Sequence, residues 1–194
     1  MASHLEESEP RYYGMHIGVV AANDDPEVLG RVKVRVPGVI DGESPWAWPI
    51  GMPGAGSAQR GLFDVPPQGS EVAVWFLQGD PERPYWMPGY WGKPGGTSEA
   101  PTALKGAEPA EQGAIKAYET ARWLVTYDER QQKERFRIED KVSGDHIEFD
   151  GNKMALEIAA TTTIRLVGKG QVLIEGLDIS IGGRKLLQNG KPIE

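Results

Sequence analysis

The chain contains no cysteine among its 194 residues. A disulfide framework, a thiolate-bound zinc site and a cysteine nucleophile are therefore excluded. The chain also lacks any stretch of about 18 apolar residues, so the sequence predicts no membrane-spanning helix. Its first residues have neither a basic region nor an apolar core, which argues against a secretory signal. These absences favour synthesis in a reducing cytosol, with stability coming from packing or oligomerisation.

Positive charge is scarce, because 21 lysine and arginine residues stand against 28 acidic residues, for a formal net charge of −7. Binding of duplex nucleic acid needs clustered lysine and arginine to neutralise phosphate, so this balance argues against such a partner. Hydrophobic residues are also few, at 39%, whereas 25 glycines and 15 prolines supply many turns. This composition favours short strands and turns over long helices.

Composition divides the chain into four zones. Residues 1–12 are acidic and polar, and we expect them to be flexible or docked on a partner. Residues 13–92 hold five of the six tryptophans and repeated turn signals. Residues 93–115 are rich in proline, glycine, alanine and glutamate, which predicts a linker. Residues 116–194 return to alternating strands.

The zone 13–92 carries five short strand signals. They cover residues 16–21, 31–37, 46–49, 71–77 and 84–91. In the second of them, Val32, Val34 and Val36 fall on one face, which we expect to be buried. The basic residues of the same strand, Arg31, Lys33 and Arg35, should then form a solvent-exposed stripe on the other face. Five short strands in so short a zone predict a five-stranded barrel of the oligonucleotide-binding (OB) type better than a sandwich.

The zone 116–194 alternates apolar and polar residues but gives each strand only one narrow apolar row. The alternation runs from Leu156 to Leu166, resumes at Val172 and shifts by one residue to reach Ile179. Burial of a single apolar row within one chain cannot offset the entropic cost of ordering the backbone, which is roughly 1–2 kcal/mol per residue. Three copies wound around one axis would bury the rows and pair the strand edges. We therefore predict an intertwined trimeric β-helix or prism for an all-β chain, with residues 122–135 forming its first strand and turn rather than a short helix.

Three segments resemble the baseplate hub and spike family of contractile phage tails and the valine–glycine-repeat spike proteins of type VI secretion. They are the run Gly30–Pro37, the tripeptide Trp46–Trp48 and the segment Gly69–Pro84, which ends in Gly-Asp-Pro-x-x-Pro. The resemblance covers roughly residues 14–187. It implies that the barrel trimerises at the base of the tail tube, and that the C-terminal strands form a trimeric needle.

The resemblance implies a structural, non-enzymatic spike in the tail baseplate of the virion, synthesised in the host cytoplasm, which pierces the host outer membrane. The implied partners are two further copies of the chain, a baseplate hub or tail tube protein at the barrel and, transiently, that membrane. Neither nucleic acid nor a cofactor is implied. Two alternatives stay open: a spike of a type VI secretion or pyocin-like particle, and an OB module that binds single-stranded nucleic acid.

Two features of the family are missing from this sequence. Some relatives carry a lysozyme domain between barrel and needle, but residues 93–115 are far too few for an enzyme. Some spikes bind iron at the tip through a His-x-His pair, whereas His4, His16 and His146 are unpaired and distant from the C-terminus. We hypothesise that a separate small tip protein caps the needle instead.

The remaining candidates for chemistry have structural explanations. Residues 51–61 are rich in glycine but lack the Gly-Lys-Ser/Thr ending of a phosphate-binding loop, so we expect a connecting loop. His146 should be a solvated strand residue pointing away from the apolar row, and the acidic pairs at residues 6–7 and 24–25 should be tail and turn residues. No catalytic, cofactor-binding or metal-binding residue is predicted. The tryptophans that we expect in the core and at trimer contacts, rather than as stacking platforms for bases, are Trp46, Trp48, Trp75, Trp86 and Trp91.

Overall fold

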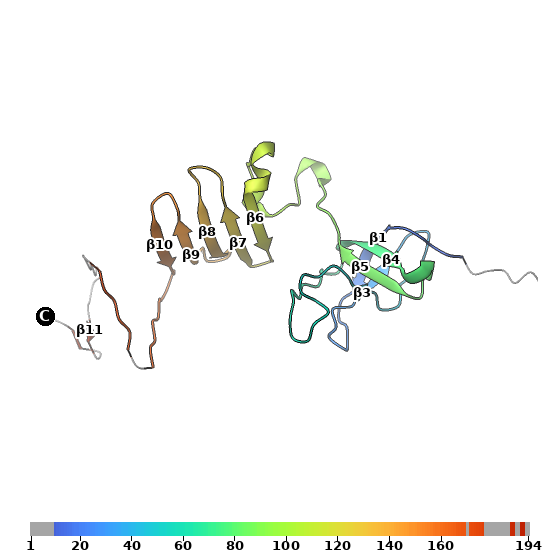
Figure 1. The fold of residues 1–194 in the computed structure, drawn as a ribbon, viewed down its shortest axis with the longest axis horizontal. Coiled ribbons are helices and arrows are strands. Elements are labelled where there is room, and N and C mark those ends of the chain that lie inside the picture. The colour runs from blue at the N-terminus through green and yellow to red at the C-terminus, as the bar shows by residue number, and fades with distance from the viewer. Residues whose placement is uncertain (1–9, 170, 177–186, 189–190, 193–194) are drawn as a thin grey trace, which may run out of the picture. The chain divides into compact units, whose positions relative to one another are not determined.

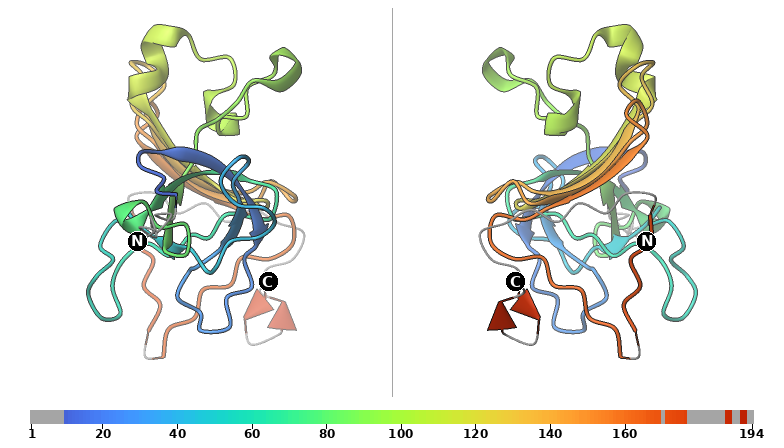
Figure 2. Two further views of the ribbon diagram at one scale, coloured as in Figure 1. Left: turned by 90° about the vertical axis from the view of Figure 1, so that its right-hand side faces the viewer. Right: turned by 90° about the vertical axis from the view of Figure 1, so that its left-hand side faces the viewer.

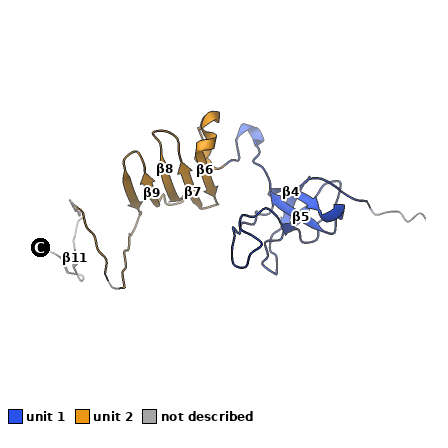
Figure 3. Cartoon of the chain, viewed as in Figure 1, with its two compact units in different colours: residues 1–100 blue, residues 101–194 orange. Residues whose placement is uncertain are grey.

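The structure is a computed structural model that describes residues 10–169, 171–176, 187–188 and 191–192. The chain divides into two compact units, residues 1–100 and residues 101–194 (Figure 3). Within the described residues, its regular structure consists of strands and four short 3₁₀ helices (Figure 1). The predicted all-β class is confirmed.

The first unit contains the five predicted strands, joined in the order β2-β1-β4-β5-β3. The neighbours are antiparallel except for β3 and β5, which run parallel. Beside the two edge strands, Val32 and Ala47 exchange backbone hydrogen bonds of 3.1 and 2.7 Å, which closes the sheet into a barrel. The strands are β1 (His16–Ala22), β2 (Lys33–Arg35), β3 (Trp48–Pro49), β4 (Glu71–Phe76) and β5 (Pro84–Pro88), and the 3₁₀ helix η1 (Leu77–Gly79) follows β4.

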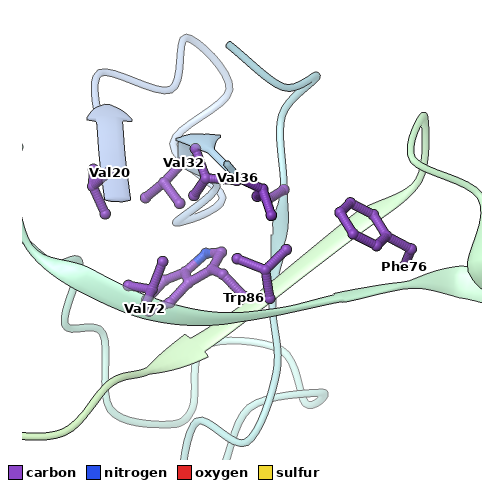
Figure 4. Packing of buried hydrophobic residues seen from close by; sticks show 9 residues of the cluster. Val20, Val32, Val36, Val72, Phe76 and Trp86 are labelled. Atoms are coloured by element: carbon purple, nitrogen blue, oxygen red, sulfur yellow. The ribbon is translucent and has the colours of Figure 1, made fainter. Parts of the chain in front are cut away.

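The barrel interior is filled largely by β-branched residues, as the alternation in the sequence predicts (Figure 4). Trp86 is fully buried, and its indole Nε1–H donates a hydrogen bond of 3.1 Å to the Gly30 carbonyl oxygen. At Gly18, the Cβ of any other residue would lie 2.8 Å from the Val74 side chain. The barrel wall therefore has no room for a larger residue at this position. The core residues are Val20, Val32, Val34, Val36, Ala47, Val72, Val74, Phe76 and Trp86.

The second unit is built on one antiparallel sheet whose five strands follow one another in sequence order. Figure 2 shows this sheet edge-on as a single curved layer. The strand and turn predicted for residues 122–135 are confirmed, because one strand fills the start of that stretch and a turn follows it. The strands are β6 (Ile115–Glu119), β7 (Trp123–Asp128), β8 (Arg135–Asp140), β9 (His146–Asp150) and β10 (Ala155–Ala159).

The predicted linker, residues 93–115, is divided between the two units. Its first part holds η2 (Pro94–Gly96), and its second part holds η3 (Thr102–Leu104) and η4 (Pro109–Ala114). The second part packs beside β6 and is anchored to the sheet, since Thr102 donates to the Glu119 carboxylate and Glu111 pairs with Arg130.

Beyond β10 the chain is extended but unpaired. Residues 160–169 and 171–176 form no strand ladder with any described residue. Of the alternation predicted from Leu156 to Leu166, only the part up to Ala159 forms a paired strand, because no further strand among the described residues lies alongside the rest. A small hairpin of β11 (Leu187–Gln188) and β12 (Lys191–Pro192) follows, whereas Ile179 lies outside the described residues.

Candidate assembly surfaces

One face of the second sheet is covered with apolar side chains that the chain itself leaves exposed. Cross-strand register groups them into two rows that run across the sheet. Phe149 is 51% exposed, although Phe136 stacks beside it at a ring-centroid distance of 6.0 Å. One row is Tyr127, Phe136, Phe149 and Leu156, and the other is Tyr118, Val125, Ile138, Ile147 and Ile158.

The opposite face of the same sheet is polar and better buried. Asp128 is only 3% exposed and receives two hydrogen bonds from the Arg130 guanidinium, at 2.9 and 2.8 Å. This pairing holds the pKa of the Asp128 carboxyl below its usual range. Arg137 donates to Glu148 at 2.8 Å in the neighbouring cross-strand pair. The chain thus satisfies its polar face internally and leaves its apolar face uncovered.

The unpaired segment after β10 adds apolar surface to the second unit. Within residues 162–176, Ile164 is 51% exposed and Ile174 is 63% exposed. Its backbone N–H and C=O groups have no ladder partner among the described residues. Extended backbone with exposed apolar side chains is a template for pairing with another chain.

The barrel wall contains a buried ion pair where we predicted a solvent-exposed basic stripe. Arg31 is only 8% exposed, so its predicted position on the wet face is wrong. Its guanidinium donates to both carboxylate oxygens of Asp25, at 2.6 and 3.1 Å, and reaches Glu27 at 2.9 Å. Asp25 also accepts from the backbone N–H of Leu29 at 2.8 Å. The Arg31 hydrogen bonds hold the pKa of the Asp25 carboxyl well below its usual range.

Two of the predicted tryptophans complete this arrangement. The guanidinium carbon of Arg31 lies 5.9 Å from the Trp46 ring centroid and 5.2 Å from the Trp48 ring centroid. Distances of this size are typical of cation–π contacts, which are stronger when the cation is desolvated. Sequence reasoning missed this cage, because Asp25 and Arg31 each fitted a simpler role in a turn and on an exposed strand face.

The five barrel tryptophans therefore have different roles. Only Trp86 lies in the core; Trp46 and Trp75 are half-buried, and Trp48 and Trp91 are exposed. The strand predicted for residues 84–91 ends at Pro88, which leaves Trp91 in an irregular segment, 67% exposed. Trp86 is thus a core residue as predicted, and the trimer contacts predicted for the other tryptophans stay a prediction.

The other predicted positions are explained by structure. Residues 51–61 lie in a largely exposed loop between β3 and β4. His146 points to the polar face, as predicted, but its side chain is only 14% exposed rather than solvated. Its Nδ1 lies 2.9 Å from the Gly144 carbonyl oxygen and its Nε2 lies 3.5 Å from Glu157. It is thus held in place by neighbours of its own sheet.

Two further kinds of site are absent from the described part of the chain. No group of three or more histidine, cysteine, aspartate or glutamate side chains there is arranged to hold a metal ion. No helix among those residues is long and apolar enough to cross a membrane.

A closed five-stranded barrel with this strand order and core defines the first unit as an OB-type domain. Residues 16–91 match the family of type VI secretion system and phage-baseplate injector OB domains. This match agrees with the OB-type barrel of the first unit and with the resemblance of that part of the chain. Comparison of the chain with curated proteins gives no significant match.

Proposed function

We propose that this chain is a non-enzymatic structural spike of a contractile phage tail baseplate, located in the virion and assembled as a homotrimer. In this proposal the barrel attaches to a hub or tail tube protein. The second units of three copies form a needle that pierces the host outer membrane. The family of residues 16–91 supports the baseplate setting.

The observation that carries the trimer is the uncovered apolar face of the second sheet. Burying one side chain of the size of Phe149 or Ile147 stabilises an assembly by about 1.5–3 kcal/mol. Three copies that turn this face to a common axis bury both rows at once, whereas their paired polar faces stay in water. Exchange of the unpaired residues 162–169 and 171–176 between copies would also satisfy their backbone groups.

The same architecture fits the spike of a type VI secretion or pyocin-like particle. The matching family includes injector domains of type VI secretion systems as well as of phage baseplates. Isolation of the assembled particle from producing cells distinguishes the two, because a phage particle carries packaged DNA. A particle without DNA would favour this second candidate.

The trimer is tested by a charge placed on the apolar face. Phe149→Asp puts three carboxylates near one axis, so we expect the variant to lose the trimeric mass in analytical ultracentrifugation. Val142→Asp makes a similar apolar-to-acidic change in the turn after β8, where the side chain is 79% exposed. That control should stay trimeric. A monomeric wild-type chain with a folded second unit contradicts the proposal.

A further inference from the structure

An open cleft of about 740 Å³ lies at one end of the barrel. It is formed between the start of β4 and the irregular chain that follows β5. The acidic and aromatic side chains that line it are Glu71, Tyr90, Trp91 and Glu99. Two aromatic rings thus share one cleft with two carboxyl groups.

These side chains form hydrogen bonds within the first unit, yet their rings and carboxylate oxygens can still contact a ligand. Glu71 accepts a hydrogen bond from the Tyr90 hydroxyl, which raises the pKa of Tyr90. Glu99 accepts the backbone N–H of Gly92 at 2.9 Å. Tyr90 is 61% exposed and Trp91 is 67% exposed, so both rings are available to a ligand. Each carboxylate retains unused acceptor positions, since an ionised carboxylate has about four.

The cleft lacks a cation. No lysine or arginine lines it, and neither carboxylate forms an ion pair with any residue that the structure describes. The Arg31 cage of the same barrel holds a guanidinium between two tryptophan rings and two carboxylates, Asp25 and Glu27. The cleft is lined by a similar set of groups, two aromatic rings and two carboxylates.

We propose that this cleft binds an arginine side chain presented by another protein. A planar guanidinium can stack on the indole of Trp91 while it donates to Glu71 and Glu99. Two carboxylates repel phosphate, which disfavours nucleic acid as the ligand. The inference goes beyond the proposed function and rests on it only in that a baseplate surrounds the barrel with other proteins.

The test titrates the full-length chain with N-acetylarginine amide and uses N-acetylcitrulline amide as an uncharged probe of nearly the same shape. The Trp91 indole N–H resonance, assigned by its loss in Trp91→Phe, reports binding at the cleft. We expect the arginine probe to shift this resonance saturably and the citrulline probe to leave it unchanged. Equal shifts with both probes, or none with either, overturn the proposal.

Variants of the cleft complete the test. Trp91→Ala and the double variant Glu71→Gln/Glu99→Gln should each weaken arginine binding by about tenfold or more, measured by calorimetry. Glu82→Gln removes an exposed carboxylate of the same barrel that does not line the cleft, and should bind as the wild type does. Unchanged binding in the cleft variants overturns the proposal.

The oligomeric mass of the cleft variants tests whether the arginine comes from another protein or from a second copy of this chain. If it came from a second copy of this chain, the cleft variants would lower the oligomeric mass in ultracentrifugation, and that outcome contradicts the assignment to another protein. An unchanged mass with weakened probe binding supports the assignment. Because the probe is small, this result does not depend on whether the second unit forms a needle.

Discussion

Charged side chains that are buried in this protein are matched by partners of opposite sign. Arg31 is enclosed by Asp25 and two tryptophan rings, and Asp128 is held by Arg130. Removing one partner of a buried pair leaves an uncompensated charge, which destabilises more than the pair itself contributes. Such pairs therefore fix the local chain path as much as they add stability.

The buried Trp86 gives a measurable prediction. Trp86→Phe removes the indole donor and leaves the Gly30 carbonyl without its side-chain partner, so we expect a loss of about 1–3 kcal/mol in the free energy of unfolding. Chemical denaturation followed by circular dichroism measures it. Trp91→Phe changes an exposed ring and should stay within about 0.5 kcal/mol of the wild type. Equal effects of the two substitutions would show that Trp86 is not a core residue in solution.

Asp140 gives a prediction in acid. The hydrogen bonds that Arg122 donates to it, at 2.9 and 2.6 Å, lower the pKa of its carboxyl from 3.8 to about 2. Because the folded state holds this proton more weakly than the unfolded state, the pair's full stabilisation is present above pH 4 or so. It is lost as the pH falls toward about 2.

The measurement compares thermal unfolding of the wild type and of Asp140→Asn between pH 7 and pH 2. The variant should be less stable at pH 7 and should lose less stability in the acidic interval. Asp24→Asn, at an exposed aspartate with no ion pair among the described residues, should follow the wild type throughout. A wild-type acid slope in Asp140→Asn would rule out this role for the pair.

Among the strands, alternation in the sequence predicts which side chains share a face but does not say how each face is covered. Val32, Val34 and Val36 are buried as predicted, because the barrel closes over them. In the second unit the same kind of pattern leaves Phe149 exposed, because no second layer among the described residues covers the sheet. Alternation alone cannot distinguish these outcomes, since the covering layer depends on contacts far away in sequence.

The candidate sites show the same limit. The connecting loop that the sequence predicts at residues 51–61 is confirmed. The sequence could not predict the Arg31 cage or the cleft at Trp91, because their members come from segments that only the folded barrel brings together. A basic residue in a valine-rich strand followed by Trp-Ala-Trp was the only local signal of the cage.

At the level of the whole chain, the two units differ in how much of their apolar surface one copy buries by itself. The barrel encloses a core within one copy, whereas the second unit exposes most of its apolar side chains. A fragment of residues 1–100 should therefore be soluble and folded, with cooperative unfolding by circular dichroism. An insoluble or unfolded fragment would place the boundary elsewhere. The full-length chain is the matched comparison, since it should sediment as a trimer.

The chain that joins the two units is held by hydrogen bonds on both sides of a short gap. Gly92 and Glu99 hydrogen-bond to each other through both backbone and side chain, which closes the last loop of the first unit. Thr102 is already fixed to Glu119 in the second unit, so only Ala100 and Pro101 separate the two anchored stretches. Because three peptide units join Glu99 to Thr102, this stretch spans at most about 11 Å when fully extended, so any separation of the two anchors beyond that length must be passed from one unit to the other.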